Sequence, residues 1–367
     1  MSAKISMVDL EQQTQALWPE LEKAVLGVLR SGRFILGPNV EAFEREAAAF
    51  LGVRFAIGVG SGTDALVLGL RALGIGPGDE VIVPSFTFFA TAEAVSLVGA
   101  TPVFAEIDPK SFCLDPAATR AALSSRTRAI VPVHLFGHPA DMSALRAIAK
   151  DRGLALLEDA AQAFGAELSG TRIGGLGDAA AFSFFPSKNL GAFGEAGLVA
   201  TNDERIADSV RSLRAHGSRQ RYVNTEIGYN ARLDEIQAAL LRVKLPHVAH
   251  WNDERRRVAA EYTAGLGGIS GLTPPCVASG FTHVFHQYTL RISGGRRDAV
   301  ARALDSAGIA TQVYYPIPIH QLPVYADRKV SLPITEAAAS EVLSLPIYPE
   351  LSSADAREIA QRVRAAL

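Results

Sequence analysis

The stretch FAIGVGSGTDALVLGLRALGIGPGDEVIVPS, residues 55–85, indicates the fold class. It joins two short apolar, β-branched runs, at 55–60 and 80–85, through a segment of helical character at 62–73. Further apolar runs follow, with segments of helical spacing between them; these runs are at 101–108, 129–135, 155–160, 180–185 and 197–202. Strands that are apolar on both faces and alternate with helices indicate a mostly parallel sheet covered on both sides. We therefore predict an α/β fold.

The length of the chain, 367 residues, exceeds the size at which a single hydrophobic core usually stops growing. We predict a large domain at 1–245, which includes an N-terminal helical arm with helical spacing at 9–31 and a second helix at 39–52. A charged helix at 247–266 then leads through a Gly/Pro-rich link to a strand in HQYTLRIS. This shift in composition predicts a smaller C-terminal α+β domain at 246–367.

The composition excludes several classes of partner. Lys and Arg total 36 against 38 Asp and Glu, so the chain has no broad basic field to attract nucleic acid or anionic lipid. The N-terminal residues have no apolar signal-peptide core, and the longest uncharged stretch is broken by Gly, Pro and Ser, so we expect no membrane span. Cys113 and Cys276 stand far apart, which argues against a disulfide framework and favours a reducing cytoplasm.

Lys188 stands out among the aromatic, small and turn-forming residues of AFSFFPSKNLGAFGEAG, residues 181–197. It follows an apolar strand and a Pro-Ser turn. A lysine that is desolvated at such a place has a depressed pKa and becomes a nucleophilic amine that can form a Schiff base. The alternative is an ordinary exposed loop lysine, because most lysines lie on the surface.

Two other segments add to the case for a site around this lysine. Asp159 ends an apolar run, where its carboxylate could pair with a protonated heterocyclic nitrogen or cap a helix. In GSGTDAL, the backbone of Gly60 and Gly62 and the hydroxyl of Thr63 open a helix directly after a strand, which favours phosphate binding. The spacing fits neither dinucleotide nor Walker motifs. Ser183 could add a hydroxyl or cap a turn. Pyridoxal phosphate needs a phosphate site, a carboxylate and an amine, so one ligand explains all three.

Several motifs together resemble the DegT/DnrJ/EryC1/StrS family of pyridoxal-phosphate-dependent nucleotide-sugar aminotransferases. The resemblance runs in order from about Val8 to Leu351 and rests on GSGTDAL, PSFTFFATAEAV, LLEDAAQAFGA, FSFFPSKNLGAFGEAG, RAHG and GYNARLDEIQAA. It implies an aspartate-aminotransferase-like fold of type I, pyridoxal 5'-phosphate as cofactor, a nucleotide-sugar substrate and an amino-acid donor, most simply L-glutamate. The products of such enzymes enter amino sugars of surface polysaccharides or glycosylated metabolites.

The lysine segment FPSKNLGAFG is similar to that of family members that aminate C3 of a keto sugar. A sugar C4 aminotransferase is the alternative within the fold. A non-catalytic regulator that binds the cofactor is a third interpretation. The related sugar dehydratases have a His in place of the lysine, so Lys188 argues against them.

The resemblance also implies roles for individual residues. Lys188 and Asp159 are the expected catalytic pair, with Asp159 at the pyridine nitrogen. The expected cofactor-binding residues are Gly62, Thr63, Phe88, Asp159, Gln162, Ser183, Lys188 and Asn230. Among them Gln162 reaches the ring hydroxyl, Phe88 stacks on the ring and Asn230 reaches the phosphate from the neighbouring subunit. The protein is therefore expected to be a homodimer with shared active sites. The expected substrate-binding residues are Arg214, His216, Arg232, Tyr314, Tyr315 and His320.

Some positions depart from the common pattern of the family. GEAG at 194–197 stands where G-D-G-G is frequent, and YYP at 314–316 where His-Tyr-Pro is frequent. These differences bear on the identity of the sugar rather than on the cofactor. The neighbouring aromatic residues are expected to be core residues rather than ring contacts; these are Phe86, Phe89, Phe184 and Phe185.

Two H-x-x-H pairs suggest a metal site at first sight. His247 and His250 lack the glutamate of H-E-x-x-H, and His283 and His286 fall in a strand-like run whose i and i+3 side chains point to opposite faces. We therefore predict no metal site.

Overall fold

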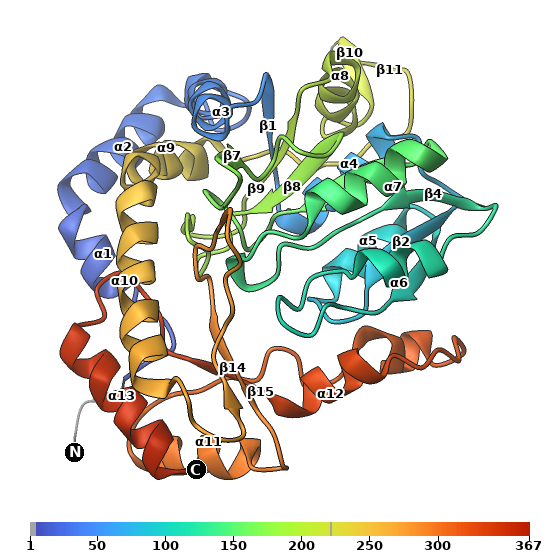
Figure 1. The fold of residues 1–367 in the computed structure, drawn as a ribbon. Helices are drawn as coiled ribbons and strands as arrows, with labels where there is room; N and C mark the ends of the chain where they lie inside the picture. Colours follow the sequence, from blue (N-terminus) through green and yellow to red (C-terminus); the bar gives the residue numbers. More distant parts are fainter. Residues whose placement is uncertain (1–4, 221) are drawn as a thin grey trace.

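The computed structural model describes residues 5–220 and 222–367 (Figure 1). Within them, a seven-stranded sheet has the order β1-β9-β8-β5-β4-β2-β3. Its strands pair in parallel, except that β9 runs antiparallel to both β8 and β1. The predicted mostly parallel α/β sheet is confirmed, and each of the seven apolar runs between residues 55 and 202 overlaps one of its strands. The strands are β1 (Phe55–Val59), β2 (Glu80–Pro84), β3 (Thr101–Ala105), β4 (Thr127–Ile130), β5 (Ala155–Asp159), β8 (Ala179–Ser183) and β9 (Gly197–Thr201).

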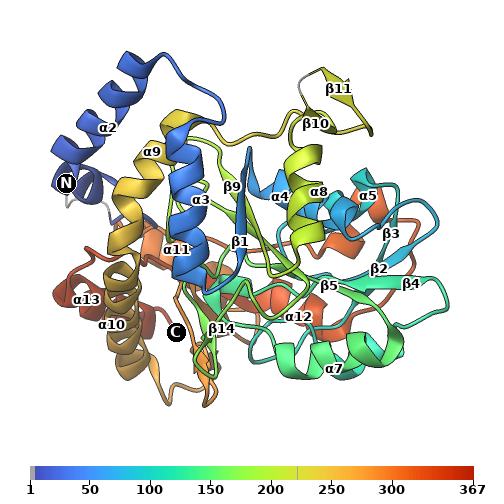
Figure 2. The same cartoon turned by 90° about the horizontal axis from the view of Figure 1, so that it is seen from above.

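Helices cover both faces of this sheet (Figure 2). Side chains alternate along each strand, so Val199 of β9 packs in the cluster that includes α4, α5 and α8, while Leu198 and Ala200 pack in the cluster with α3 and α9. The predicted helix at 9–31 is two helices that meet at Leu17. The helices are α1 (Glu11–Ala16), α2 (Trp18–Ser31), α3 (Pro38–Leu51), α4 (Gly62–Ala72), α5 (Ala90–Leu97), α6 (Pro116–Ala121), α7 (Met142–Arg152), α8 (Glu204–Leu213) and α9 (Glu235–Lys244), with a 3-10 turn η1 (Leu135–Gly137).

The C-terminal part contains helices and a small sheet, and many of their buried residues form one hydrophobic cluster. In Figure 1 the gold helix α10 runs from below α9 down toward α13 and α11. A small antiparallel sheet has the order β12-β14-β15. The elements are η2 (Leu245–His247), α10 (Val248–Leu266), β12 (Leu272–Thr273), β14 (Tyr288–Ile292), α11 (Arg297–Ser306), η3 (Ile319–Gln321), η4 (Pro323–Tyr325), α12 (Pro333–Glu341), β15 (Val342–Leu345) and α13 (Ser353–Ala365).

Two of the contacts that join the beginning and middle of the chain to this C-terminal part are backbone β pairings. Ile5 forms a parallel bridge with Ile309. A second small sheet, in the order β13-β6-β7, pairs β13 (Phe281–Thr282) with β6 (Glu167–Leu168), which pairs in turn with β7 (Thr171–Arg172). The division at residue 245 therefore stays a prediction. In the described part of the chain, no helix combines the length and the apolar character that crossing a bilayer requires.

Candidate active site

A cavity of about 510 Å³ lies where β5 and β8 end and where α4 follows β1. This is the edge of an α/β sheet at which ligands usually bind, and the volume is that of a small-molecule site. The cavity brings together most of the residues predicted from the sequence. Those that line it are Gly62, Thr63, Phe88, Asp159, Gln162, Ser183, Lys188, Tyr314 and Tyr315.

Lys188 lies in a tight loop that leaves the end of β8. The loop is closed by a hydrogen bond from Ala192 N to Phe184 O of 2.7 Å. Gly191 makes the turn possible, because a Cβ at that position would lie only 2.1 Å from Pro186 O. Gly191 is therefore required by the turn that presents the amine to the cavity.

The environment of Lys188 favours its neutral amine. Burial lowers the pKa of Lys188 to about 8, because the ammonium loses its hydration, while the nearby Asp159 carboxylate opposes the shift. At pH 7 about a tenth of the amine is therefore unprotonated, compared with less than about a thousandth for a lysine of ordinary pKa. The alternative interpretation as an ordinary surface lysine is wrong, since the side chain lines the cavity.

Asp159 is the last residue of β5 and is 5% exposed. Its Oδ2 accepts a hydrogen bond from Thr91 Oγ1 at 2.7 Å and its Oδ1 accepts one from Ala161 N at 3.2 Å. Burial raises the pKa of Asp159, whereas these two hydrogen bonds and the charge of Lys188 act in the opposite direction. No α-helix starts at the residues that follow it, so the helix-cap alternative is wrong.

The start of α4 forms a cradle with Ser183. Ser61 is the N-cap, and its Oγ accepts a hydrogen bond from Asp64 N at 3.0 Å. Gly62 is the first helical residue, and a Cβ on it would lie 2.6 Å from the Cβ of Ser183. Only glycine therefore lets the Ser183 hydroxyl approach the helix N-terminus, where backbone N–H groups favour an anion. Thr63 lines the cavity beside them.

Gln162 and two aromatic residues complete this part of the cavity. Gln162 Oε1 accepts a hydrogen bond from Phe136 N at 2.7 Å, and its Nε2 donates to the Tyr315 hydroxyl at 3.2 Å. The amide is thus held with its nitrogen toward Tyr315. Phe88 is 57% exposed, and its ring centre lies 6.2 Å from that of Tyr315. An exposed ring at the wall of a cavity can stack on a flat ligand.

Of the six predicted substrate residues, only Tyr314 and Tyr315 line this cavity. Two of the other four, Arg214 and His320, are buried elsewhere. Arg214 is 7% exposed and forms a salt bridge with Glu44. His320 is 4% exposed; its Nδ1 lies 2.7 Å from Ser85 Oγ and its Nε2 lies 3.3 Å from the Glu336 carboxylate. Both side chains have structural partners in this chain, and their assignment to the substrate stays a prediction.

The remaining predicted residues lie around a separate surface hollow of about 520 Å³, which His216 and Arg232 line. Asn230 is adjacent, because its Oδ1 accepts a hydrogen bond from Arg232 Nη2. The hollow borders a hairpin of β10 (Ser218–Gln220) and β11 (Val223–Asn224), which extends at the margin of the molecule in Figure 2. A role for these residues in the neighbouring subunit's site therefore stays a prediction.

The expectation for the aromatic residues is partly wrong. Phe86 and Phe184 are fully buried and Phe89 packs against the core, as expected. Phe185 is instead 47% exposed and lines the cavity of Lys188. Because it follows the end of β8, it no longer obeys the alternation of the strand.

The prediction that His283 and His286 lie on opposite faces of a strand is wrong. The strand β14 begins only at Tyr288, and Phe285 has a positive φ of 42°. His286 is 5% exposed and lines the cavity, and its Nδ1 has no hydrogen-bond partner among the described residues. Burial, together with the nearby charges of Lys188 and Arg255, lowers the pKa of His286, so its ring is neutral. Among the described residues no three potential ligand side chains are grouped to hold a metal ion.

Sequence reasoning missed several other residues at the site. Ser61 could have been found, because Ser followed three residues later by Asp64 is a helix-start signal. Thr91 reaches Asp159 only through the tertiary fold, and no local pattern marks it. Glu195, in the segment that departs from the family pattern, is a further acidic group that lines the cavity.

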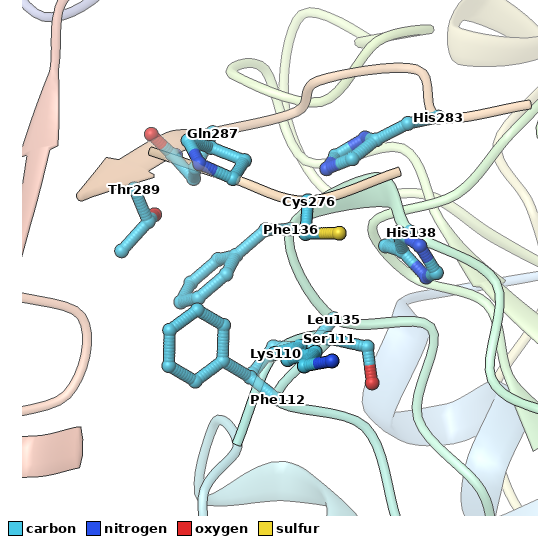
Figure 3. Close-up of a pocket in the computed structure, with 11 residues that line it drawn as sticks. Lys110, Ser111, Phe112, Leu135, Phe136, His138, Cys276, His283, Gln287 and Thr289 are labelled. Atoms are coloured by element: carbon cyan, nitrogen blue, oxygen red, sulfur yellow. The ribbon is translucent and has the colours of Figure 1, made fainter. Parts of the chain in front are cut away.

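A second, much smaller cavity of about 10 Å³ shares Phe136 and Gln287 with the wall of the first. Figure 3 shows the side chains around it, among them His138, Cys276 and His283. This volume holds about one water molecule, so the small cavity is no substrate site.

Pyridoxal phosphate requires an amine, a carboxylate and a phosphate site, and this cavity provides all three on an α/β fold. The chain belongs to the DegT/DnrJ/EryC1/StrS aminotransferase family, which it matches over residues 16–364.

Individual relatives cover nearly the whole chain. A UDP-N-acetyl-3-dehydro-alpha-D-glucosamine 3-aminotransferase of Acidithiobacillus ferrooxidans is 48% identical over 99% of this chain and 98% of its own. A "Pleiotropic regulatory protein" of Geobacillus stearothermophilus is 47% identical over 98% of this chain and 97% of its own. The crystal structure of S. venezuelae DesV "in complex with ketimine intermediate" is 48% identical, with a TM-score of 0.97 over 99% of this chain and 98% of that chain.

Proposed function

We propose that this protein is a pyridoxal-phosphate-dependent aminotransferase that transfers an amino group from L-glutamate to the C3 keto group of a nucleotide-linked sugar. One observation carries the proposal: a single cavity contains the Lys188 amine, the Asp159 carboxylate and the Gly62 cradle. The nucleotide sugar and the C3 position are supported by the relative named a 3-aminotransferase.

The residues of the cavity fit pyridoxal phosphate. The N-terminus of α4, with Thr63 and Ser183, provides donors for a phosphate, in a space that a Cβ on Gly62 would fill. Asp159 would hold the ring nitrogen and Phe88 would cover one face of the ring. Gln162 Nε2 would donate to the ring hydroxyl. When bound, the cofactor supplies an electron sink for negative charge that develops on the substrate carbon.

Lys188 and Asp159 are the residues proposed to carry out acid-base catalysis. Lys188 would hold the cofactor aldehyde through its neutral amine, and the same amine, when free, would move a proton from the Cα of the amino donor. The amine pKa of about 8 suits both steps, because a group with a pKa near the working pH can accept and release a proton. Asp159 would keep the ring nitrogen protonated, a role that requires its carboxylate to be ionised. Thr91 and the backbone N–H of Ala161 support that ionised form.

A panel of keto-sugar nucleotides tests the substrate. The protein is incubated with L-glutamate and each sugar, products are detected by mass spectrometry, and the position of the new amine is assigned by NMR. Amination at C3 is the expected result. Amination at C4 would establish the alternative enzyme and contradict the assignment made from FPSKNLGAFG.

A regulator that binds the cofactor without turnover is a second candidate, because one relative carries the name of a pleiotropic regulatory protein. The half-reaction distinguishes the two. An aminotransferase converts its bound cofactor to the amine form when L-glutamate is added without a sugar, and the absorbance spectrum reports this conversion. A spectrum that stays constant over a range of amino donors would favour the regulator.

The protein is further proposed to act as a homodimer with shared active sites. Several large apolar side chains are exposed on the N-terminal arm, on the segment after α2 and near the lysine loop: Trp18, Leu29, Phe34, Ile35 and Phe193. A group of exposed apolar side chains of this kind is typical of an interface. Mixing inactive Lys188→Ala and Asn230→Ala subunits should restore activity, because one site of each mixed dimer is then intact. A mixture without activity, in a protein that light scattering shows to be dimeric, would contradict shared sites.

The compartment is proposed to be the cytoplasm. Cys113 and Cys276 are both free thiols, and Cys276 is exposed. An exposed free thiol suits a reducing compartment. Fractionation of the source cells, with detection by antibody, tests this proposal, and recovery of the protein outside the cytoplasm would contradict it.

A further inference from the structure

The loop that carries Lys188 is tied to the C-terminal part of the chain through the next residue, Asn189. The Asn189 side chain is 4% exposed, and its Nδ2 donates to Asn252 Oδ1 at 2.7 Å and to Val284 O at 2.9 Å. Asn252 lies on α10, is 2% exposed and is itself fixed by a hydrogen bond from its Nδ2 to Phe164 O at 3.1 Å. These three groups, Asn189, Asn252 and the Val284 carbonyl, form what we call the asparagine clamp.

The clamp reaches the segment that supplies another wall of the cavity. Val284 N donates to Gly137 O at 3.1 Å and Gln287 N donates to Phe136 O at 3.2 Å, so the segment 284–287 is pinned to η1 at both ends. His286 and Gln287 of this segment line the cavity together with Lys188. The clamp therefore links the backbone beside Lys188 to a wall that faces the same ligand.

A second anchor holds the far side of the loop but not its tip. The tip, where Lys188 lies, therefore depends on the clamp. Lys244 Nζ donates to Gly191 O at the far side of the loop. At the tip, Lys188 N donates to Phe185 O at 2.8 Å, which closes a turn within the loop and ties it to nothing outside. If Asn189 loses its donor group, two buried acceptors lose their partner, and a loop of this kind relaxes toward solvent to satisfy them.

We propose that Asn189 is a positioning residue for Lys188: through the asparagine clamp it holds the amine in the cavity, at a fixed place relative to the segment 284–287. This inference rests on the proposed function only in that Lys188 is the reacting amine. An amine pKa of about 8 agrees with it, because that value requires the side chain to stay buried.

Two variants remove the donor group of the clamp. Asn189→Asp keeps the size of the side chain but presents only acceptors, and Asn189→Ala removes the side chain beyond Cβ. Asn189→Ala leaves unchanged the titratable groups that share the cavity with Lys188, which are Asp159, Glu195, His286, Tyr314 and Tyr315. Asn189→Asp adds a carboxylate whose charge itself raises the pKa of Lys188, so Asn189→Ala decides the labelling result. Thr289→Val is the matched control, because it removes another buried hydrogen bond, to Ser344 at 2.8 Å, away from the loop.

The first readout needs no turnover. Cofactor-free protein is labelled with acetic anhydride across a pH series, and modification of Lys188 is quantified by mass spectrometry, with exposed Lys150 as the internal standard. For the Asn189 variants the half-point of labelling should rise by about one pH unit or more, toward the value of a solvated lysine. Thr289→Val should lower only the melting temperature.

The second readout uses the protein loaded with cofactor. Displacement of a reacting group by about 1 Å costs on the order of 100-fold, so kcat should fall by about 10- to 100-fold while KM for the amino donor changes by less than about 3-fold. Asn252→Ala alone should have a smaller effect, and in combination with Asn189→Ala it should add nothing, because both act through one contact.

The outcomes separate this inference from the proposed function. Wild-type protein that fails to transfer amino groups would overturn the proposed function, whereas the labelling still tests the clamp. A folded Asn189→Asp or Asn189→Ala protein whose Lys188 labels with the wild-type half-point would overturn the clamp. Independent, additive effects of Asn189→Ala and Asn252→Ala on kcat would also overturn it.

Discussion

Substituting Gly62 by alanine tests the phosphate cradle most sharply. The new Cβ would lie 2.6 Å from Ser183 Cβ and 3.2 Å from Ser183 Cα, so either β8 or α4 must shift. The displaced hydroxyl loses at least one hydrogen bond to a charged phosphate, a contribution of about 1.5–3 kcal/mol. Since about 1.4 kcal/mol is a tenfold change in affinity, the dissociation constant of pyridoxal phosphate should increase about 10- to 100-fold.

The assay is a titration of cofactor-free protein with pyridoxal phosphate, followed by absorbance. Gly27→Ala is the control, because Gly27 lies inside α2 and an added Cβ there meets no atom within 4 Å. That variant should bind the cofactor as the wild type does and should be more stable by about 0.5–1 kcal/mol. A Gly62→Ala protein that binds the cofactor within about 2-fold of the wild type would refute the cradle.

Other predictions concern the carboxylate and the amine. Asp159→Asn should retain the cofactor but lower kcat by about 100-fold or more, measured by steady-state kinetics. Burial raises the pKa of Asp159, so above the ordinary pKa of an aspartate its ionised form destabilises the folded protein. Cofactor-free Asp159→Asn should therefore melt at a higher temperature than the cofactor-free wild type. A lower melting temperature would contradict the raised pKa. Thr91→Val removes a hydrogen bond that favours the carboxylate, so the acid limb of the kcat profile should move to higher pH. In wild-type cofactor-free protein, acylation of Lys188 should rise with pH and level off above about 8, because protonation removes the nucleophile below that pH; a half-point near 10.5 would contradict the burial of the amine.

The strands and the core of the site could be predicted because their signals are local. An apolar, β-branched run predicts a buried strand from its own residues, without knowledge of the rest of the chain. The residues at their ends then meet at one edge of the sheet by topology alone. This is why Asp159, Lys188 and Gly62, which come from three separate segments, could be assigned to one ligand.

The remaining features depend on contacts between residues distant in sequence. Arg214 carries the charge expected of a substrate-binding residue, yet in this chain it pairs with Glu44, whose position is set by α3. Thr91 lies in the first turn of α5 and reaches Asp159 only because the start of that helix lies near the end of β5. His286 enters the cavity because Phe285 adopts a left-handed backbone. Neither burial nor hydrogen-bond partner is encoded in the spacing of such residues.

The central claim is that Lys188 is the amine that binds the cofactor and transfers the proton. Lys244 is the natural rival, because burial lowers its pKa to about 8 as well, but its Nζ donates to Gly191 O and it does not line the cavity. Borohydride treatment of the protein loaded with pyridoxal phosphate, followed by peptide mass spectrometry, identifies the lysine that holds the cofactor. We predict the added mass on Lys188, and neither this mass nor amino-group transfer in Lys188→Ala. The mass on Lys244, or unchanged transfer by Lys188→Ala, would contradict the account.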